Sequence, residues 1–431
     1  MANQDMKMCA EEALKGNLED CARLLFPQEG ETMPKLRFSG FNGGWERKLL
    51  SECLEISDER NTDNLYGIED VLSVSDDYGV VNQIELLGRS YAGKSVSGYK
   101  VLRPGQIVYT KSPLKAKPYG IVKQNTGKAG IVSVLYAVYN PKEGVAPEYI
   151  HYYFDPAWRL NAYMRPLVNK GAKNTMNISD ETALTGYIMI PKDIEEQRRI
   201  ASYLQSLDEQ IALQQQQLER LKQMKQSCLG LLFADNQSIT PPLRFKGFSG
   251  EWKKVILKDI CEINPHTMLP EVFEYVDLES VVGTTMVSHR TERKGSAPSR
   301  AQRLAKDGDI FFQTVRPYQR NNFLFKKMEK PFVFSTGYAQ IRTTINQGFL
   351  FNALQTDYFV CQVLDNCTGS SYPAINPTTL SNLSVVITDD IKEQQCIADY
   401  FDSLDKQITT QTQQLEKLNQ MKKACLNQFI A

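Results

Sequence analysis

Two long segments of the chain place apolar residues alternately four and three positions apart. The first series is Ile200, Leu204, Leu207, Ile211, Gln214, Leu218 and Leu221, and the second is Ile397, Phe401, Leu404, Ile408, Gln411, Leu415 and Leu418. Neither segment contains proline, and strong helix formers fill the intervening positions. The pattern predicts two long helices, each with the heptad seam of a coiled coil.

A seam this narrow needs a partner, because one helix cannot bury its own apolar stripe. The other segment is the obvious partner, so we expect the two helices to pack antiparallel, each about 60 Å long at about 1.5 Å per residue. Gln214 and Gln411 would then form polar layers that set the register. The alternative is that each helix packs only on its own globular domain.

The two helical segments are copies of each other. The sequence IEEQRRIASYLQSLDEQI starts at Ile194, and IKEQQCIADYFDSLDKQI starts 197 residues later at Ile391. A second shared motif opens each half, PKLRFSGF followed by Trp45 and PPLRFKGF followed by Trp252. A repeat of this length predicts two similar domain-sized units.

Between the shared motifs, short β-prone runs are separated by Gly, Pro, Ser and Asn. Examples are 106–110, 130–139, 309–313 and 338–343. We therefore predict an α+β fold with two globular domains, related by an approximate two-fold axis and separated by a long antiparallel two-helix coiled coil. The predicted parts are a helical N-terminal extension at 1–33, a first domain at 34–190, a helix at 191–234, a linker at 235–240, a second domain at 241–388 and a helix at 389–431.

The composition narrows the class of protein. A chain of 431 residues, 42% hydrophobic and 23% charged, is typical of a two-domain soluble protein. Residues 1–33 lack a secretory signal, and no run of about 18 apolar residues occurs, so we expect a cytoplasmic protein without a membrane span. Nine cysteines without a C-x-x-C pair and three histidines predict neither a zinc site nor a disulfide framework.

The net charge is zero, but basic residues are concentrated in both halves. No acidic residue lies between Glu85 and Glu143, an interval with ten Lys and Arg, and residues 290–330 hold eleven against four acids. A charge run is often only a solvated face. Its recurrence in both halves favours the neutralisation of nucleic-acid phosphates.

One nucleotide-binding motif is present but lacks its context. Residues 88–95 match G-x-x-x-x-G-K-S, the loop that cradles phosphates at the start of a helix. Gly98 and Pro104 follow without a helical period, so nucleotide hydrolysis is disfavoured. No methyltransferase motif or hydrolase triad is identifiable either, and the sequence indicates a binding protein.

These motifs together resemble the specificity subunit of type I restriction-modification systems. The resemblance rests on the two domain-opening motifs, the Gly308-Asp-Ile310 turn and the Glu-Gln-x-x-Ile helices at 196–200 and 393–397, and it covers 34–431. The first half departs from the pattern, because its turn reads Gly105-Gln-Ile107.

The resemblance implies two target recognition domains, each reading one half of a bipartite, asymmetric site in double-stranded DNA, with a spacer set by the helices. It also implies that two modification subunits, which methylate adenine, dock on the helices and that restriction subunits join them. The chain itself would be non-catalytic and bind no metal or cofactor. S-adenosylmethionine, ATP and Mg would belong to the partner subunits.

Candidate DNA contacts follow from charge and residue type. For phosphates they are Lys94, Lys111, Lys115, Lys117, Arg290, Arg293, Lys294 and Arg300, and for bases they are Lys173, Asn174, Arg316, Arg320, Ser370, Ser371 and Tyr372. A coiled-coil scaffold joining two protein-binding domains is the rival hypothesis. It would explain the repeat and the helices but not the paired basic segments.

Overall fold

The computed structural model describes residues 37–114, 117–170, 176–235 and 238–427. The chain divides into two compact units, each with its own hydrophobic core. Unit 1 comprises Met1–Gln214 and Gln414–Ala431, and unit 2 comprises Gln215–Gln413. Each long helix therefore contributes one segment to each unit. The predicted extension at 1–33 lies outside the described residues.

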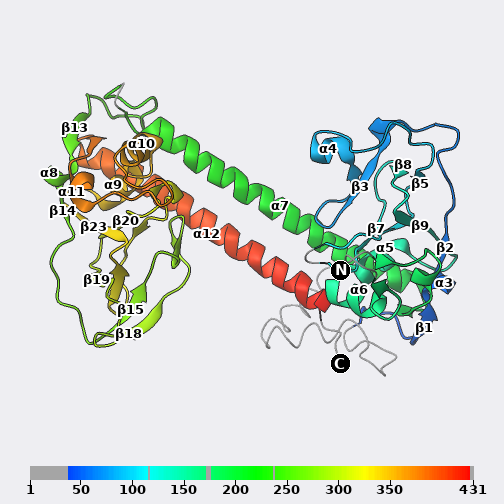
Figure 1. Cartoon of the computed structure of the whole chain (residues 1–431). Helices are drawn as coiled ribbons and strands as arrows, with labels where there is room; N and C mark the ends of the chain where they lie inside the picture. Colours follow the sequence, from blue (N-terminus) through cyan, green and yellow to red (C-terminus); the bar gives the residue numbers. More distant parts are fainter. Residues whose placement is uncertain (1–36, 115–116, 171–175, 236–237, 428–431) are drawn as a thin grey trace. The chain divides into compact units, whose positions relative to one another are not determined.

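Unit 1 is built around a four-stranded antiparallel sheet in the order β2-β9-β6-β7. Figure 1 labels β2, β9 and β7 of this sheet. Two-stranded pairs β1-β12, β3-β4, β5-β8 and β10-β11 complete its described strands. The strands are β1 (Trp45–Leu49), β2 (Leu54–Ile56), β3 (Leu72–Ser75), β4 (Gly79–Asn82), β5 (Lys100–Leu102), β6 (Ile107–Thr110), β7 (Ile121–Gln124), β8 (Gly130–Val132), β9 (Tyr136–Pro141), β10 (Asn169–Lys170), β11 (Met176–Asn177) and β12 (Tyr187–Pro191). The helices are α3 (Leu50–Cys53), η1 (Ile68–Asp70), α4 (Gln83–Leu87), α5 (Pro147–Phe154), α6 (Ala157–Met164) and η3 (Thr182–Leu184).

Unit 2 repeats the central sheet as β14-β23-β20-β21 and adds a second four-stranded sheet, β18-β15-β22-β19, in which β15 and β22 run parallel. The strands are β13 (Lys253–Ile256), β14 (Cys261–Ile263), β15 (Val272–Val276), β16 (Val281–Val282), β17 (Thr285–Met286), β18 (Arg290–Arg293), β19 (Ala301–Leu304), β20 (Ile310–Gln313), β21 (Phe323–Leu324), β22 (Phe332–Ser335), β23 (Tyr338–Thr343) and β24 (Ser384–Ile387). The helices are α8 (Leu257–Ile260), η4 (Pro317–Gln319), α9 (Gln347–Ala353), α10 (Asp357–Asp365) and α11 (Pro377–Ser381).

The α+β class and the predicted strands are confirmed, with one difference. The predicted run 106–110 contains β6, 309–313 contains β20, and 338–343 is β23. The run 130–139 is not one strand, because a turn with exposed Val134 and Leu135 separates β8 from β9. The two strands pair with different partners, β5 and β6, which the apolar pattern did not indicate.

The two long helices are α7 (Ile194–Leu232) and α12 (Ile391–Asn427), close to the predicted 191–234 and 389–431. Each begins after an aspartate whose carboxylate accepts a backbone hydrogen bond from the first turn. Asp193 accepts from the amide of Glu195 at 2.9 Å, and Asp390 accepts from that of Lys392 at 2.8 Å. Such caps satisfy amide groups that have no partner within the helix.

The repeated Glu-Gln pair at the start of each helix explains the motif that opens each half. In unit 1, Glu196 accepts two hydrogen bonds from the guanidinium of Arg37, at 2.6 and 2.5 Å, and one from the indole of Trp45 at 3.3 Å. The Glu196 carboxylate is buried, and a buried charge is unfavourable unless charged or polar groups donate hydrogen bonds to it. Arg37 of PKLRFSGF and the Trp45 that follows it thus anchor the helix to its domain.

Unit 2 makes the same contacts with the second copy. Glu393 accepts from Arg244 at 2.7 and 2.8 Å and from the indole of Trp252 at 3.2 Å. The neighbouring glutamines act alike as well, since Gln197 accepts from the amide of Ala146 and Gln394 from that of Asn346. The sequence repeat is therefore a repeat of tertiary contacts.

The turn that precedes the central strand is also shared. Gly105 and Gly308 both have positive φ, at 85° and 82°. Gln106 accepts a backbone hydrogen bond from Arg103 at 2.6 Å, and Asp309 accepts the equivalent one from Lys306 at 2.8 Å. Glutamine in the first half therefore closes the same turn as aspartate in the second.

Within each unit the segments of α7 and α12 run antiparallel. In unit 1, Lys422 pairs with Asp208 at 2.7 Å, and Cys425 contacts Tyr203. In unit 2, Lys225 pairs with Asp405 at 2.5 Å, Cys228 lies 3.3 Å from the hydroxyl of Tyr400, and Gln411 donates to Gln217 at 2.9 Å. The two lysine–aspartate pairs occupy equivalent positions of the repeat.

All fourteen predicted seam positions are buried or partly buried. Ile200, Leu204 and Leu207 belong to the core of unit 1, where Leu418 packs partly buried against it. Ile397, Phe401 and Leu404 belong to the core of unit 2. The predicted antiparallel pairing is confirmed, and the seam also packs on the globular domain of each unit. The alternative, in which each helix packs only on its own domain, is wrong.

Candidate nucleic-acid interface

Two loops of unit 2 meet at the end of the central sheet and bring several predicted base contacts together. One loop follows β20 and contains η4, and the other lies between α10 and α11. The amide of Arg316 donates to the carbonyl of Pro373 at 2.7 Å, and Val315 forms a β-bridge with Ala374. We call residues 314–322 the arginine loop.

Arg316 and Tyr372 stack on each other across these two loops. The guanidinium carbon of Arg316 lies 4.4 Å from the centre of the Tyr372 ring, which is 63% exposed. Ser370 and Ser371, next to Tyr372, are also exposed. The partly buried Arg316 and three exposed residues thus lie in two adjoining loops, although 54 or more residues separate Arg316 from the other three in sequence.

Arg320, at the other end of the arginine loop, is directed differently. Its guanidinium donates to the backbone carbonyl of Gln355 at 3.1 Å and pairs with Asp357 at the start of α10. In unit 1 the ammonium of Lys117 donates to the equivalent carbonyl, that of Asp155, at 2.8 Å. Both basic side chains hold the loop after the central strand against the turn between two helices.

The predicted phosphate contacts of unit 2 lie on β18 and in the segment after it. Arg290, Arg293, Lys294 and Arg300 are all exposed. Arg290 lies between Asp277 and Glu292, at 2.8 Å from each, and its pKa is raised by these two carboxylates. Arg293 and Arg300 have no carboxylate within 4 Å in the described part of the chain. Their charges are therefore better suited to contact DNA phosphates than the charge of Arg290.

In unit 1 the predicted phosphate contacts differ in exposure. Lys94 is exposed in the loop before β5. Lys111 shares the carboxylate of Asp180 with buried Lys100. Lys117 is buried and pairs with Asp76 at 2.5 Å, so its ammonium is engaged within the fold. Its burial favours a structural role, for which the sequence gave no signal.

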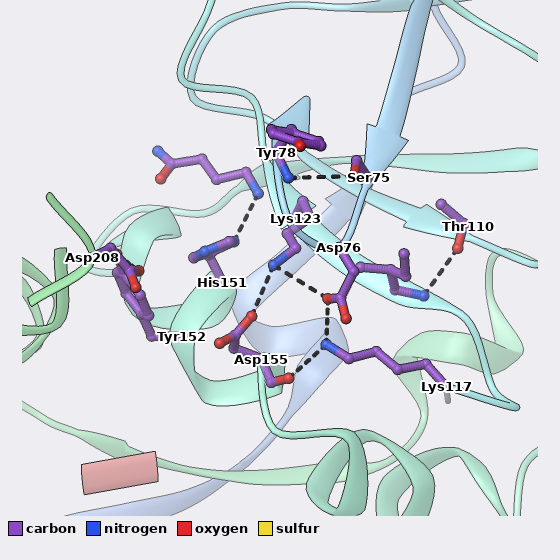
Figure 2. A network of polar contacts seen from close by, with 12 residues as sticks. Ser75, Asp76, Tyr78, Thr110, Lys117, Lys123, His151, Tyr152, Asp155 and Asp208 are labelled. Atoms are coloured by element: carbon purple, nitrogen blue, oxygen red, sulfur yellow. Dashed lines mark hydrogen bonds and ion pairs between the residues drawn. The ribbon is translucent and has the colours of Figure 1, made fainter. Parts of the chain in front are cut away.

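Lys117 belongs to a larger polar network around Asp155 (Figure 2). Lys123 pairs with Asp155 at 2.8 Å and lies 3.7 Å from Asp76, which also accepts from Lys117. Lys422 of α12 adds a contact of 3.4 Å to Asp155. Burial by itself raises the pKa of the Asp155 carboxyl, but Lys123 and Lys422 outweigh it and hold that pKa below its usual value.

His151, on α5, borders this network. Its Nδ1 accepts a long hydrogen bond of 3.4 Å from the amide of Gln124. Burial lowers the pKa of His151 to about 3, and the nearby charge of Lys123 contributes in the same direction. The imidazole is therefore neutral at neutral pH.

Three predicted contacts, Lys115, Lys173 and Asn174, lie outside the described residues. The phosphate-loop interpretation is disfavoured by the structure as it was by the sequence. Residues 91–99 form a loop and β5 follows at Lys100, so no helix opens after Ser95. Among the described residues, no group of three or more His, Cys, Asp or Glu side chains could hold a metal ion. None of the described helices is long and apolar enough to cross a membrane.

A family comparison agrees with the repeated architecture. A sequence profile of the family described as "Type I restriction modification DNA specificity domain" matches residues 93–223 and again 249–420. The chain belongs to this family. The matched ranges cover more than half of the chain, one in each half, and identify it as a DNA-recognition subunit with two specificity domains.

One solved structure shows a similar fold, and two others match with lower TM-scores. The S subunit of a type I restriction-modification system from M. genitalium has 14% sequence identity and a TM-score of 0.57, with 91% of this chain and 98% of that chain covered. The HsdS subunit from Thermoanaerobacter tengcongensis has 17% identity and a TM-score of 0.41, with 90% and 97% covered. A chain from a study of "complex assembly and conformational transition of the type I R-M system" has 18% identity and a TM-score of 0.47, with the same coverage.

Proposed function

We propose that the two domains of this specificity subunit each read one half of a bipartite, asymmetric DNA site, and that the chain carries modification and restriction subunits to that site. The observation that supports this most directly is the family match, which occurs twice in one chain in the order of the two units. Unlike domains are expected to bind unlike half-sites, in the way that symmetric dimers bind symmetric ones.

The side-chain inventory supports a recognition role. Exposed basic residues, Lys94 in unit 1 and Arg293 and Arg300 in unit 2, suit contacts with the phosphate backbone. Arg316 and Tyr372 suit contacts with bases. We propose that methyl transfer to adenine and ATP-driven cleavage take place on the partner subunits, which would bind S-adenosylmethionine, ATP and Mg.

The helices α7 and α12 are the proposed docking elements for the modification subunits. The seam uses one face of each helix, and α7 still exposes apolar Leu213 and Met224 outside it. Exposed apolar side chains on a helix surface are suitable contacts for another subunit. Copurification of two modification subunits with the full chain would support this part of the proposal.

Selection from a library of randomised DNA duplexes tests the DNA-reading function. With the full chain assembled with its modification subunits, we expect two separate sequence elements to be enriched. We also expect binding of a fixed enriched duplex to weaken steeply with salt, with a slope near about −4.5 if about five phosphates are neutralised. The rival scaffold function predicts neither enrichment nor a steep slope.

Two variants sharpen this test. Arg293→Ala should reduce the salt slope by about 1 and leave the enriched sequence unchanged, because phosphate contacts carry no sequence information. Arg165→Ala removes an exposed arginine of unit 1 that is not a candidate contact, and it serves as the control. Equal effects of the two substitutions would contradict the assignment of Arg293.

A further inference from the structure

The arginine loop has an unusual backbone. Arg316 and Arg320 both adopt the left-handed conformation, with φ of 55° and 54°, at the two ends of η4. The other described non-glycine residues with positive φ are Asn64 and Asn264, and asparagine tolerates this region. Arginine has no such preference, so two arginines in one loop mark a backbone held in place by its surroundings.

A network of buried amide side chains holds the loop. Asn322 accepts from the backbone amide of Gln313 at 2.7 Å and donates to the side chain of Gln355 at 3.2 Å. Gln313 accepts from the backbone of Asn321 at 3.2 Å and donates to Gln319 at 2.9 Å. Gln313, Asn322 and Gln355 are no more than 4% exposed. The side-chain nitrogen of Gln355 has no partner in the described part of the chain, whereas the other bonds of this buried network restrain the backbone that they contact.

Arg320 fastens the far end of the loop to α10. Besides the carbonyl of Gln355, it contacts the carboxylate of Asp357, which also accepts from Gln226 of α7 at 3.3 Å. The side chain of Arg320 is thus committed to the fold on two sides. Its role is to position the loop.

The guanidinium of Arg316 is restrained by a stacking contact and not by an ion pair. No carboxylate lies within 4 Å of it in the described part of the chain, whereas Arg290 and Arg320 have acidic partners. Its restraint is the Tyr372 ring, which contacts the flat face of the guanidinium at 4.4 Å. Stacking on the face leaves the N–H groups along the edge directed outward in the plane of the group.

We propose that Arg316 reads a guanine in the half-site of unit 2, and that Gln313, Asn322, Gln355 and Arg320 are positioning residues that fix it in the reading geometry. This rests on the proposed DNA-reading function. A planar guanidinium with a free edge matches the O6 and N7 acceptors of guanine in the major groove. A loop that is already held in its binding conformation loses little conformational entropy when it contacts DNA.

The library selection described above, with the full chain and its modification subunits, tests the proposal. Arg316→Lys keeps the charge but loses the planar fork, so we expect preference for guanine at one position to fall about tenfold to a hundredfold. Preferences in the other sequence element should not change. Arg47→Lys is the matched control, because Arg47 also stacks on a tyrosine, Tyr187, at 4.2 Å but lies on β1.

Positioning is tested with two further variants. Asn322→Ala should lower the preference for guanine at the same position of the site. This substitution can also impair folding, so Asp357→Asn provides a second measurement. Asp357 is exposed, so Asp357→Asn should leave thermal stability nearly unchanged while it removes the charge that pairs with Arg320 and weakens the guanine preference. A purely electrostatic effect would instead strengthen binding to all duplexes equally.

The outcomes separate the two proposals. If the wild-type chain enriches no sequence element, the proposed function itself fails. If it enriches two elements and Arg316→Lys leaves every position unchanged, only the guanine assignment is overturned. A loss of preference spread over both elements would also overturn it. If Arg316→Lys has the expected effect but Asp357→Asn and a folded Asn322→Ala variant do not, the positioning role is overturned.

Discussion

His151 shows how one residue can give unit 1 a pH-dependent stability. Its ring lies on α5, and the charged neighbours are Asp155, Lys123, Lys117 and Lys422. Burial lowers the pKa of His151 to about 3. In the unfolded chain a histidine has a pKa near about 6.5. Between these values the unfolded chain binds more protons than the folded chain, so stability falls as the pH falls through that window.

The replacement His151→Gln should flatten this dependence. Glutamine keeps an acceptor for the amide of Gln124 but does not titrate. Between about pH 7.5 and about pH 5, the free energy of unfolding should therefore fall by about 1 to 2 kcal/mol less in the variant than in the wild type. Urea unfolding followed by the fluorescence of Trp45 and Trp158 measures it. The control is His266→Gln, in an exposed loop of unit 2. Parallel pH profiles for wild type and His151→Gln would exclude the assigned role.

At the scale of secondary-structure elements, the long helices are fixed to their domains by repeated polar contacts. Each helix begins with the buried Glu-Gln pair that binds the opening motif of its domain. Each also carries a lysine one turn before a cysteine, Lys225 or Lys422, which pairs with an aspartate of the other helix. Antiparallel packing is therefore specified by charge as well as by the apolar seam.

The two lysines differ in their partners, which gives a matched comparison. Lys422 contacts both Asp208 and the largely buried Asp155, whereas Lys225 has Asp405 as its carboxylate partner among the described residues. Methionine keeps most of the apolar stem of lysine, so Lys422→Met tests mainly the charge. In chemical denaturation, we expect Lys422→Met to lower the free energy of unfolding by about 2 kcal/mol and Lys225→Met to lower it by less than about 1 kcal/mol. Equal costs would show that Asp155 does not depend on Lys422.

At the scale of the whole molecule, the two units have separate cores and separate candidate surfaces. The candidate contacts of unit 1 come from the β5 and β6 region, and those of unit 2 come from the arginine loop and β18. Unit 2 also has a second four-stranded sheet, whereas the corresponding region of unit 1 forms β3-β4 and β5-β8. Different surfaces on a shared framework are what recognition of two unlike half-sites requires.

Separate surfaces predict additive effects on binding. Arg316→Ala and Lys94→Ala, one in each unit, should change the free energy of DNA binding independently, with a coupling below about 0.5 kcal/mol. Arg316→Ala and Tyr372→Ala should be non-additive, because their side chains stack. Double-mutant cycles on one enriched duplex measure both. Strong coupling between Arg316 and Lys94 would argue against independent reading of half-sites.

The repeat, the helices with their seam and the α+β class could be predicted from the amino-acid sequence, because periodicity and repeated motifs are local properties of the chain. Residue type made Arg316, Ser370, Ser371 and Tyr372 candidate base contacts, but the fold brings them together. The exposure of each basic residue likewise depends on the fold. Lys117 and Arg320 were predicted to contact DNA, but they bind partners distant in sequence, Asp76 and Asp357. Such pairings depend on how strands and helices come together, and no spacing along the chain records them.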